Sequence, residues 1–330
     1  MIWLWVVLAI SYIFSIVLLE VSMKKLSAIK SFYKDKPEKT DIMRRYDIGK
    51  WSRPRLYIGA ILLVPRVILI ILSVLAHYTL TKISMIGYKE QDEPLSPIRR
   101  FILTASSRFW ARVLLLGAGF WRIKTEGDPL ECSIISANHC SWIDIIYFLT
   151  SPELPSFVSK ASVKSFPCVG IIATAMQCIF IERTLDKDGA LKAIQRRQKI
   201  LNQGFPKLLV FPEGTTTNGT GLMPFKRGGF IELLPVQPVV IKYEQRNFSP
   251  CMEIVPMLAH VVMLTCQFSN SLTVYRLPVV RPKQGWTAEE YAEHVRGIIA
   301  GFMKVPKVNY SIMEKANLIT QIFDEKPKEF

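Results

Sequence analysis

From Trp121 onward, short apolar runs rich in β-branched residues alternate with longer segments of helical periodicity. The strand-like runs cover residues 121–125, 132–137, 155–159, 177–182, 207–211, 237–243 and 272–279. Helical patterns cover residues 141–150, 188–202 and 288–303, and Thr287 and Glu290 stand at the spacing of a capping box before the last. This alternation predicts one α/β sandwich over residues 121–305, built on a mixed, largely parallel sheet of about seven strands. Residues 306–330 are polar and loosely patterned, so we expect a C-terminal tail with at most a short helix.

The chain begins with an uncharged apolar run. Ile2 to Leu19 supply eighteen such residues, the lower end of the length that spans a bilayer as a helix. No basic residue precedes this run and no small-residue cleavage site follows it, which favours a retained anchor over a cleaved signal peptide. We therefore expect a transmembrane anchor at residues 1–22. Between Lys24 and Arg55 there are eleven basic and four acidic residues, so the positive-inside rule predicts that residues 23–55 form a cytosolic loop.

A second apolar segment, from Leu56 to Leu80, is interrupted by Pro65 and Arg66. Neither arm beside the proline is long enough to span a membrane alone, and an arginine near the bilayer centre costs about 2.5 to 3.5 kcal/mol. The pattern therefore predicts a re-entrant or membrane-embedded helical hairpin over residues 56–82, bent at Pro65. This arrangement keeps the downstream domain on the cytosolic side. A tilted full span is the alternative, and it would move that domain to the lumen.

A third apolar stretch, residues 100–120, carries Arg108 and Arg112 four residues apart, which places them on one face of a helix. This spacing is typical of an interfacial helix whose arginines face lipid phosphates. A helix buried against the domain remains the alternative.

The net charge of the chain indicates which partners it can bind, and its cysteines indicate its redox compartment. Lys and Arg together number 42 against 27 Asp and Glu, a net charge of +15 that suits anionic partners such as phosphates and lipid headgroups. Nucleic acid is disfavoured because much of the basic excess flanks apolar segments and no nucleic-acid-binding motif is present. The six cysteines show no C-x-x-C pair and no metal-ligand spacing, which is typical of reduced core residues in a reducing compartment.

His139 and Asp144 form the first candidate site. His139 follows the apolar run 132–137, at the end of a strand, and Asn138 is placed to cap a helix that starts near Ser141. Residues five apart do not share a helix face, so His139 must lie in the turn before the helix with Asp144 reaching back to it. The carboxylate can then hold one ring N–H and leave the other nitrogen as a general base. A structural pair is the alternative for this motif taken alone, and a thiol nucleophile at Cys140 is disfavoured.

A second group of candidates follows the strand-like run 207–211. Glu213, Gly214 and Thr215 offer a carboxylate, a flexible turn and a hydroxyl where backbone N–H groups can receive a phosphate. Arg183, at the end of the run 177–182, and Lys226, beside two glycines, are cations suited to the same phosphate. The alternatives are an ordinary turn for 213–215 and surface ion pairs for the two cations.

Four segments taken in order, NHCSWID, IFIERT, FPEGTTTN and PVQPVVIKY, resemble the four motif blocks of the phosphate and lysophospholipid acyltransferase family. Within that family the chain is most similar to lysophosphatidylcholine and lysophosphatidylethanolamine acyltransferases. The resemblance implies that His139, oriented by Asp144, deprotonates the hydroxyl of a lysophospholipid, which attacks acyl-CoA directly. It implies an acceptor phosphate site of Arg183, Glu213, Gly214 and Thr215, with Lys226 nearby. Backbone N–H groups at the helix after His139 are candidates for the oxyanion donors.

The resemblance also implies no cofactor and no metal, with acyl-CoA, the lysophospholipid and the membrane as partners. It implies an integral protein of the endoplasmic reticulum whose catalytic domain faces the cytosol. Lysophosphatidic acid or glycerol 3-phosphate is the alternative acceptor, because those enzymes share all four blocks. A CoA-independent transacylase and a non-catalytic membrane tether are the alternatives from other classes.

Overall fold

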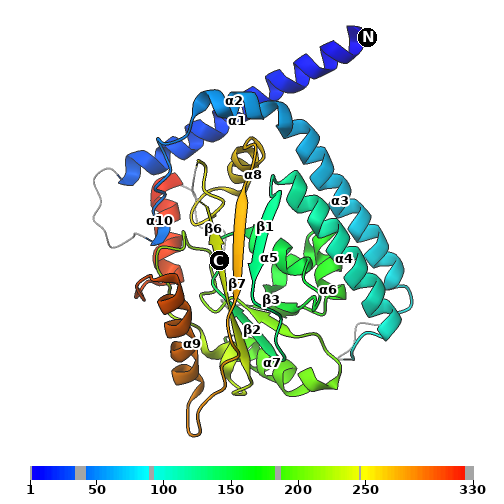
Figure 1. The fold of residues 1–330 in the computed structure, drawn as a ribbon, viewed down its shortest axis with the longest axis vertical. Helices are drawn as coiled ribbons and strands as arrows, with labels where there is room; N and C mark the ends of the chain where they lie inside the picture. Colours follow the sequence, from blue (N-terminus) through cyan, green and yellow to red (C-terminus); the bar gives the residue numbers. More distant parts are fainter. Residues whose placement is uncertain (1, 34–41, 89–92, 183–186, 245–246, 324–330) are drawn as a thin grey trace.

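The computed structural model of the protein describes residues 2–33, 42–88, 93–182, 187–244 and 247–323. Its centre is a seven-stranded sheet in the order β1-β7-β6-β2-β5-β3-β4 (Figure 1). Neighbouring strands pair in parallel except β6 and β7, which are antiparallel. The strands are β1 (Arg122–Glu126), β2 (Ile134–Ala137), β3 (Ser156–Lys160), β4 (Ile179–Ile181), β5 (Leu208–Val210), β6 (Val236–Tyr243) and β7 (Ser271–Arg276). The predicted mixed, largely parallel sheet is confirmed, and each strand overlaps its predicted run.

Ten α-helices accompany the sheet among the described residues. They are α1 (Ile2–Tyr33), α2 (Arg53–Gly59), α3 (Leu63–Ser84), α4 (Pro97–Gly117), α5 (Trp142–Leu149), α6 (Val169–Ala175), α7 (Lys187–Ile200), α8 (Met257–Thr265), α9 (Ala288–Met303) and α10 (Ile312–Phe323). The predicted helices correspond to α5, α7 and α9, and the predicted Thr287 capping box is present. The short 3-10 helices are η2 (Ala60–Leu62), η3 (Ala161–Ser165), η4 (Leu201–Gln203) and η5 (Arg227–Phe230).

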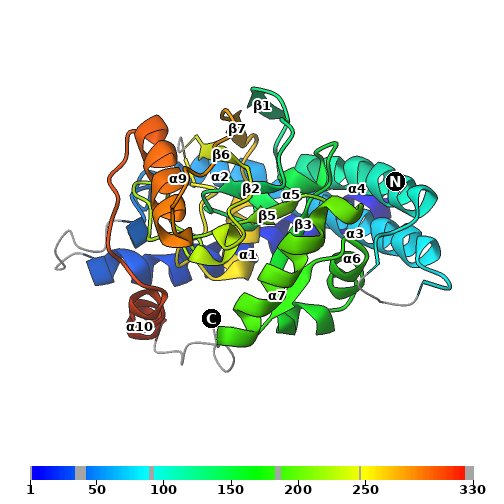
Figure 2. The ribbon, with the colours of Figure 1, turned by 90° about the horizontal axis from the view of Figure 1, so that it is seen from below.

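The middle of the sheet is covered on both faces, which is why β2, β5 and most of β6 are buried on both sides, whereas the edge strand β1 is polar and mostly exposed. Ile135 of β2 packs into a core with α1, α4, α5 and α8. Its neighbour Ile134 points to the other face, into a core with α7 and α9. Figure 2 shows α3 and α4 together on one side of the molecule and α9 and α10 on the other.

The amino-terminal region departs from its predicted boundaries. α1 continues past residue 22 to Tyr33, so the prediction of a loop is wrong for residues 23–33. No proline or glycine interrupts this stretch, and Met23, Leu26 and Ile29 recur at helical spacing and are buried against the body. The first part of α1 projects away from the body in Figure 1, and its residues 2–8 are exposed.

The predicted hairpin bent at Pro65 is also wrong in its geometry. The chain leaves α2 through η2, and Pro65 lies in the first turn of α3, where its missing N–H costs nothing. The antiparallel partner of α3 is α4, and the two helices lie side by side in Figures 1 and 2.

Arg66 explains why the chain does not bend there. Its guanidinium is buried and donates to the carbonyl oxygens of Thr265 (2.8 Å), Phe268 (2.9 Å) and Gln267 at the end of α8. These carbonyls lack helical partners, so the arginine caps α8 instead of meeting lipid. In a membrane, the charge of Arg66 would be costly. In the structure, its hydrogen bonds connect α3 to the domain instead.

α4 covers the stretch predicted as an interfacial helix. Arg108 and Arg112 are both exposed, on a face that also exposes Phe101 and Phe109. Two helical stretches, Ile2–Ile29 and Arg53–Ser84, are long and apolar enough to cross a membrane. Together with this face of α4, they support association of the protein with a membrane.

Candidate active site

The strands β2, β5 and β6 run in parallel, so their carboxyl ends meet at one edge of the sheet. His139 follows β2 at this edge, in the turn before α5, and Asp144 lies in the first turn of α5. His139 Nδ1 lies 2.8 Å from Asp144 Oδ2. The two side chains therefore have the relative placement that their five-residue spacing requires.

Local sequence explains why α5 begins where it does. Ser141 caps the helix and forms a capping box with Asp144, whose Oδ2 also accepts the N–H of Cys140 (2.7 Å) and of Ser141 (2.9 Å). The prediction that Asn138 caps this helix is wrong. Its side-chain amide instead pairs with the backbone of Ile241 in β6, accepting its N–H (2.7 Å) and donating to its carbonyl (3.0 Å).

Asp144 is fully buried, and four donors surround its carboxylate. Besides the two amides and His139 on Oδ2, the hydroxyl of Tyr243 donates to Oδ1. A buried carboxylate held in this way accepts the hydrogen on Nδ1 and leaves Nε2 of the imidazole as the acceptor. Because the amides of Cys140 and Ser141 are bonded to Asp144, the prediction that backbone N–H groups of this turn stabilise an oxyanion is wrong for these two.

Phe211 fixes the plane of the imidazole. Its ring stacks on His139 with centroids 4.1 Å apart and an interplanar angle of 15°. Phe211 directly follows β5 and precedes the 213–215 turn, so the segment after β5 contributes both the stacking ring and the turn. His139 has 15% of its side chain exposed, so the stacked ring still reaches solvent.

The 213–217 loop is tied directly to the histidine turn. Glu213 accepts the N–H of His139 (3.1 Å) on one oxygen and the N–H of Met223 (3.1 Å) on the other. Thr217 N–H donates to the carbonyl of His139 (2.9 Å). Burial raises the pKa of Glu213 to about 7, although these hydrogen bonds oppose the shift. Its carboxylate is thus engaged by the backbone, which suits positioning of the turn rather than direct contact with an anionic phosphate.

Gly214, Thr215 and Lys226 lie around the same turn. Gly214 has a φ of +73°, and a Cβ there would come 2.7 Å from Lys226 Nζ, so only glycine allows the ammonium to approach the backbone. Thr215 is partly exposed and its Oγ1 accepts a hydrogen bond from Lys315 Nζ (2.9 Å). Lys226 and Thr215 therefore present a cation and a hydroxyl at the turn whose loop is hydrogen-bonded to the backbone of His139. Arg183, the remaining candidate, lies outside the described residues.

Tyr243 and Lys315 also contact the residues of the candidate site, and the motif spacing does not predict either of them. Tyr243 belongs to the PVQPVVIKY segment, but nothing in its spacing indicates that its hydroxyl reaches Asp144. Lys315 lies in the segment expected to be a tail. A signal was present, because Lys315, Leu318, Ile319 and Ile322 recur at helical spacing and place a lysine on an otherwise apolar face.

The alternative of a thiol nucleophile at Cys140 is not favoured by its surroundings. A hydrogen bond with Cys251, together with burial, holds the pKa of the Cys140 thiol well above its ordinary value. A reactive cysteine requires the opposite shift. Among the described residues, no group of three His, Cys, Asp or Glu side chains is placed to hold a metal ion.

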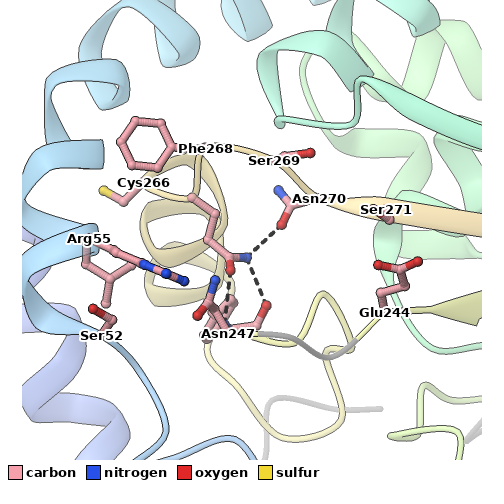
Figure 3. Close-up of a pocket in the computed structure, with 12 residues that line it drawn as sticks. Ser52, Arg55, Glu244, Asn247, Cys266, Phe268, Ser269, Asn270 and Ser271 are labelled. Carbon is pink, nitrogen blue, oxygen red and sulfur yellow. Dashed lines mark hydrogen bonds between the residues drawn. The ribbon is translucent and has the colours of Figure 1, made fainter.

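A pocket of about 360 Å³ opens farther along the same edge, between the start of α2, the end of β6 and the loop before β7 (Figure 3). Glu244, which follows Tyr243, lines it. Gln267 in its wall bonds to Asn270 Oδ1 (2.6 Å) and to the backbone of Phe248. Among the described residues that line the pocket, none belongs to the candidate site.

Comparison with known proteins agrees with the motif blocks. Residues 124–242 match the family model described as acyltransferase. The chain is 30% identical to lysophospholipid acyltransferase LPEAT2 of Arabidopsis thaliana, over 86% of this chain and 53% of that protein. It is 32% identical to LPEAT1 of the same organism, over 64% and 62%. It is 30% identical to lysophosphatidylcholine acyltransferase 2 of Rattus norvegicus, over 77% and 48%.

One solved structure is also similar, that of the 1-acyl-sn-glycerophosphate (LPA) acyltransferase PlsC from Thermotoga maritima. The superposition covers 72% of this chain and 96% of the PlsC chain, with a TM-score of 0.48 and 17% sequence identity. This similarity is too weak to support a conclusion.

The fold and the edge site define an α/β domain with a histidine–aspartate pair beside a glycine turn. Residues 124–242, which contain this pair and turn, belong to the acyltransferase family. The chain spans about half to three fifths of the length of the relatives described above.

Proposed function

We propose that the protein transfers a fatty acyl group from acyl-CoA to the free hydroxyl of a lysophospholipid. The observation that carries the proposal is the direct hydrogen bonding between the His139 turn and the 213–217 loop. This contact supports a site in which His139 acts as the base and the neighbouring loop receives the acceptor phosphate. The names of the similar relatives support a lysophospholipid as the acceptor, and one of them names lysophosphatidylcholine. We propose lysophosphatidylcholine or lysophosphatidylethanolamine as the acceptor.

In the proposed reaction, Nε2 of His139 takes the proton of the acceptor hydroxyl while the oxygen attacks the thioester carbonyl. The tetrahedral intermediate then collapses, the carbon–sulfur bond breaks, and the departing CoA sulfur receives the proton from the imidazolium. Asp144 holds the ring and stabilises its charged form. The thioester is already activated, so no covalent acyl-enzyme and no cofactor is required.

The acceptor phosphate would lie against Gly214 and Thr215, with Lys226 as a neutralising cation. A cation beside a glycine turn suits a phosphate diester because the backbone can approach its oxygens closely. Arg183, which follows β4 in the sequence, would add a planar, bidentate donor. Glu213 would hold the turn against His139 and so fix the distance between the phosphate and the base.

The apolar helices would hold the domain at the membrane that contains the acceptor. We place the protein in the endoplasmic reticulum membrane with the site facing the cytosol, where acyl-CoA is found. The basic excess between Lys24 and Arg55 supports this orientation, because such segments stay on the cytosolic side.

An acceptor panel tests the proposal. The purified full chain in phospholipid vesicles would receive labelled oleoyl-CoA with lysophosphatidylcholine, lysophosphatidylethanolamine, lysophosphatidic acid or glycerol 3-phosphate. We expect labelled phospholipid with the first two acceptors and release of one CoA per ester formed. A strong preference for lysophosphatidic acid or glycerol 3-phosphate would overturn the choice of acceptor. Transfer from intact phospholipid without acyl-CoA would overturn the choice of donor.

A further inference from the structure

Lys315 is a buried lysine that reaches the candidate site from the far end of the chain. It lies on α10 with 3% of its surface exposed. Its ammonium donates to Thr215 Oγ1 (2.9 Å), Thr216 O (2.7 Å) and Thr216 Oγ1 (3.1 Å). All three N–H donors of the ammonium are thus directed at two consecutive residues of the 213–217 loop.

The partners of Lys315 are neutral oxygens. Glu213 and Glu253 are the nearby carboxylates, and they raise the pKa of Lys315, but burial outweighs them and lowers it to about 7. A lysine buried without an ion pair is costly, so it stabilises the fold less than an apolar side chain of similar size would. The placement therefore suits a role at the site better than a role in packing.

The hydrogen bonds decide where the two threonine hydroxyls point. The Thr216 hydroxyl accepts a hydrogen bond from Lys315 and donates its own hydrogen to Met252 O (2.6 Å). Its hydrogen is therefore already used within the protein. Thr215 also accepts from Lys315. Within the described part of the chain, the Thr215 hydroxyl hydrogen has no acceptor. Since Lys315 holds one lone pair of this oxygen, the hydrogen is left to point away from the lysine and toward a ligand.

The helix that carries Lys315 is itself anchored. Ser311 and Glu314 form reciprocal hydrogen bonds at the start of α10, and Ala316 and Leu318 are buried on its inner face. Figures 1 and 2 show α10 lying against α1, and Lys25 of α1 lies 5.9 Å from the ring centroid of Phe323. α10 thus connects the amino-terminal helix to the site loop.

We propose that Lys315 is a positioning residue for the acceptor: it fixes Thr215 and Thr216 so that the Thr215 hydroxyl donates to the acceptor phosphate. The inference rests on the proposed function for the identity of the acceptor. The positioning of the loop itself can be tested without that assumption.

The kinetic test compares Lys315→Met, which keeps the length and removes the ammonium, with Lys315→Arg, which keeps the charge. We expect Lys315→Met to raise the KM for lysophosphatidylcholine about tenfold, because a hydrogen bond to a charged group is lost. The kcat and the KM for oleoyl-CoA should change little. Lys315→Arg should restore much of the loss. Lys307→Met is the matched control, because Lys307 pairs with Glu293 at the surface just before α10 and should behave as wild type. An unchanged KM in an active, folded Lys315→Met protein would overturn the proposal.

A double-mutant cycle separates positioning from a general loss of stability. If Lys315 acts through Thr215, then Thr215→Val should raise the same KM, and adding Lys315→Met to it should have little further effect. Effects that multiply would show that the two residues act independently and would overturn the proposal.

Hydrogen exchange of the full chain gives a readout that does not depend on activity. We expect the amides of Thr217 and Asn218, bonded to His139 O and Ile42 O, to exchange faster in Lys315→Met than in Lys307→Met, while β6 is unaffected. Equal exchange rates in the two variants would overturn the positioning of the loop. A wild-type protein that acylates no lysophospholipid would refute the proposed function, and the exchange measurement would still decide whether Lys315 positions the loop.

Discussion

Asp144 and Tyr243 both help to hold the His139 imidazole, but Asp144 makes more of the hydrogen bonds. Asp144 binds His139 and also the amides of Cys140 and Ser141, whereas Tyr243 makes one bond to the opposite oxygen. Loss of Asp144 would release the ring and the whole turn. Loss of the Tyr243 hydroxyl would leave the other three partners of the carboxylate in place.

We therefore predict that kcat falls further in Asp144→Asn than in Tyr243→Phe. Asp144→Asn should lower kcat by about 10² or more, since an amide group cannot accept the hydrogen bonds on both of its positions. Tyr243→Phe should lower kcat less than tenfold and destabilise the protein by about 1 kcal/mol, the net worth of one hydrogen bond. Steady-state kinetics and urea unfolding of the two variants check this order. A larger kinetic effect at Tyr243 than at Asp144 would show that Asp144 is not the residue that orients the base.

Glu213 gives the site a pH-dependent stability. Burial raises its pKa to about 7 from the ordinary 4.5, so between these values the folded protein holds a proton that the unfolded chain has released. The free energy of unfolding contributed by this group should fall by about 3 kcal/mol as the pH rises through that interval. Glu213→Gln should remove this part of the slope, measured by urea unfolding between pH 4.5 and 8. The exposed Glu131→Gln is the control, and an unchanged slope in Glu213→Gln would contradict the account.

The sequence predicted some site residues and not others for a physical reason. His139 and Asp144 are close along the chain, so their spacing and the strand before them define their geometry. Tyr243 and Lys315 reach the site from distant segments, through the pairing of β6 with β2 and the packing of α10. Such contacts depend on tertiary packing, which no local pattern encodes.

At the level of elements, the strands were predictable because each is a short apolar run bounded by turn residues. α8 was missed because its nine residues, MLAHVVMLT, are apolar all round and show no amphipathic period. A hairpin bent at Pro65 is expected only if Arg66 meets lipid; in the structure the carbonyls at the end of α8 bind its guanidinium.

The approach of α2 to α8 depends on one glycine. A Cβ at Gly59 would lie 1.8 Å from the carbonyl oxygen of Cys266, so the two elements must separate if the residue is enlarged. We predict that Gly59→Ala destabilises the protein by about 1 to 3 kcal/mol or more, as for an overpacked core. Gly297→Ala in α9 meets nothing within 4 Å and should instead be neutral or stabilising. Thermal unfolding of the pair measures the difference, and equal stabilities would contradict this close packing.

At the scale of the whole molecule, exposed apolar side chains gather on the helices of the amino-terminal third. They include Ile13 and Phe14 of α1, Ile68, Ile71 and Leu72 of α3, and Phe101 and Phe109 of α4. A patch of this kind on a folded protein marks contact with a membrane or a partner. The sequence predicted apolar segments here, and the structure adds that α3, α4 and the second half of α1 each keep one face on the domain.

Charges placed on this surface should weaken membrane binding. α1 alone is long enough to hold the protein on a vesicle, so the test must report on α3 itself. Ile68→Glu combined with Leu72→Glu is expected to lift the α3 face out of the lipid, because each charge in the hydrocarbon region costs about 2.5 to 3.5 kcal/mol. Leu130→Glu, at an exposed leucine of the loop before β2, is the matched control and should leave α3 in contact with lipid. Labelling of α3 by a photoactivatable phospholipid checks the comparison, and equal labelling of α3 in the two proteins would show that the α3 face does not enter the membrane.

If His139 is the base of an acyl transfer, its loss must show in the turnover of labelled oleoyl-CoA with lysophosphatidylcholine by His139→Ala. His294→Ala serves as the control, because His294 lies on α9 beside Trp286 and away from the site. We expect kcat to fall by about 10² to 10⁴ in His139→Ala, with circular dichroism and thermal unfolding unchanged, while His294→Ala stays near wild type. Turnover by a folded His139→Ala protein at the rate of the His294→Ala control would contradict this role of His139.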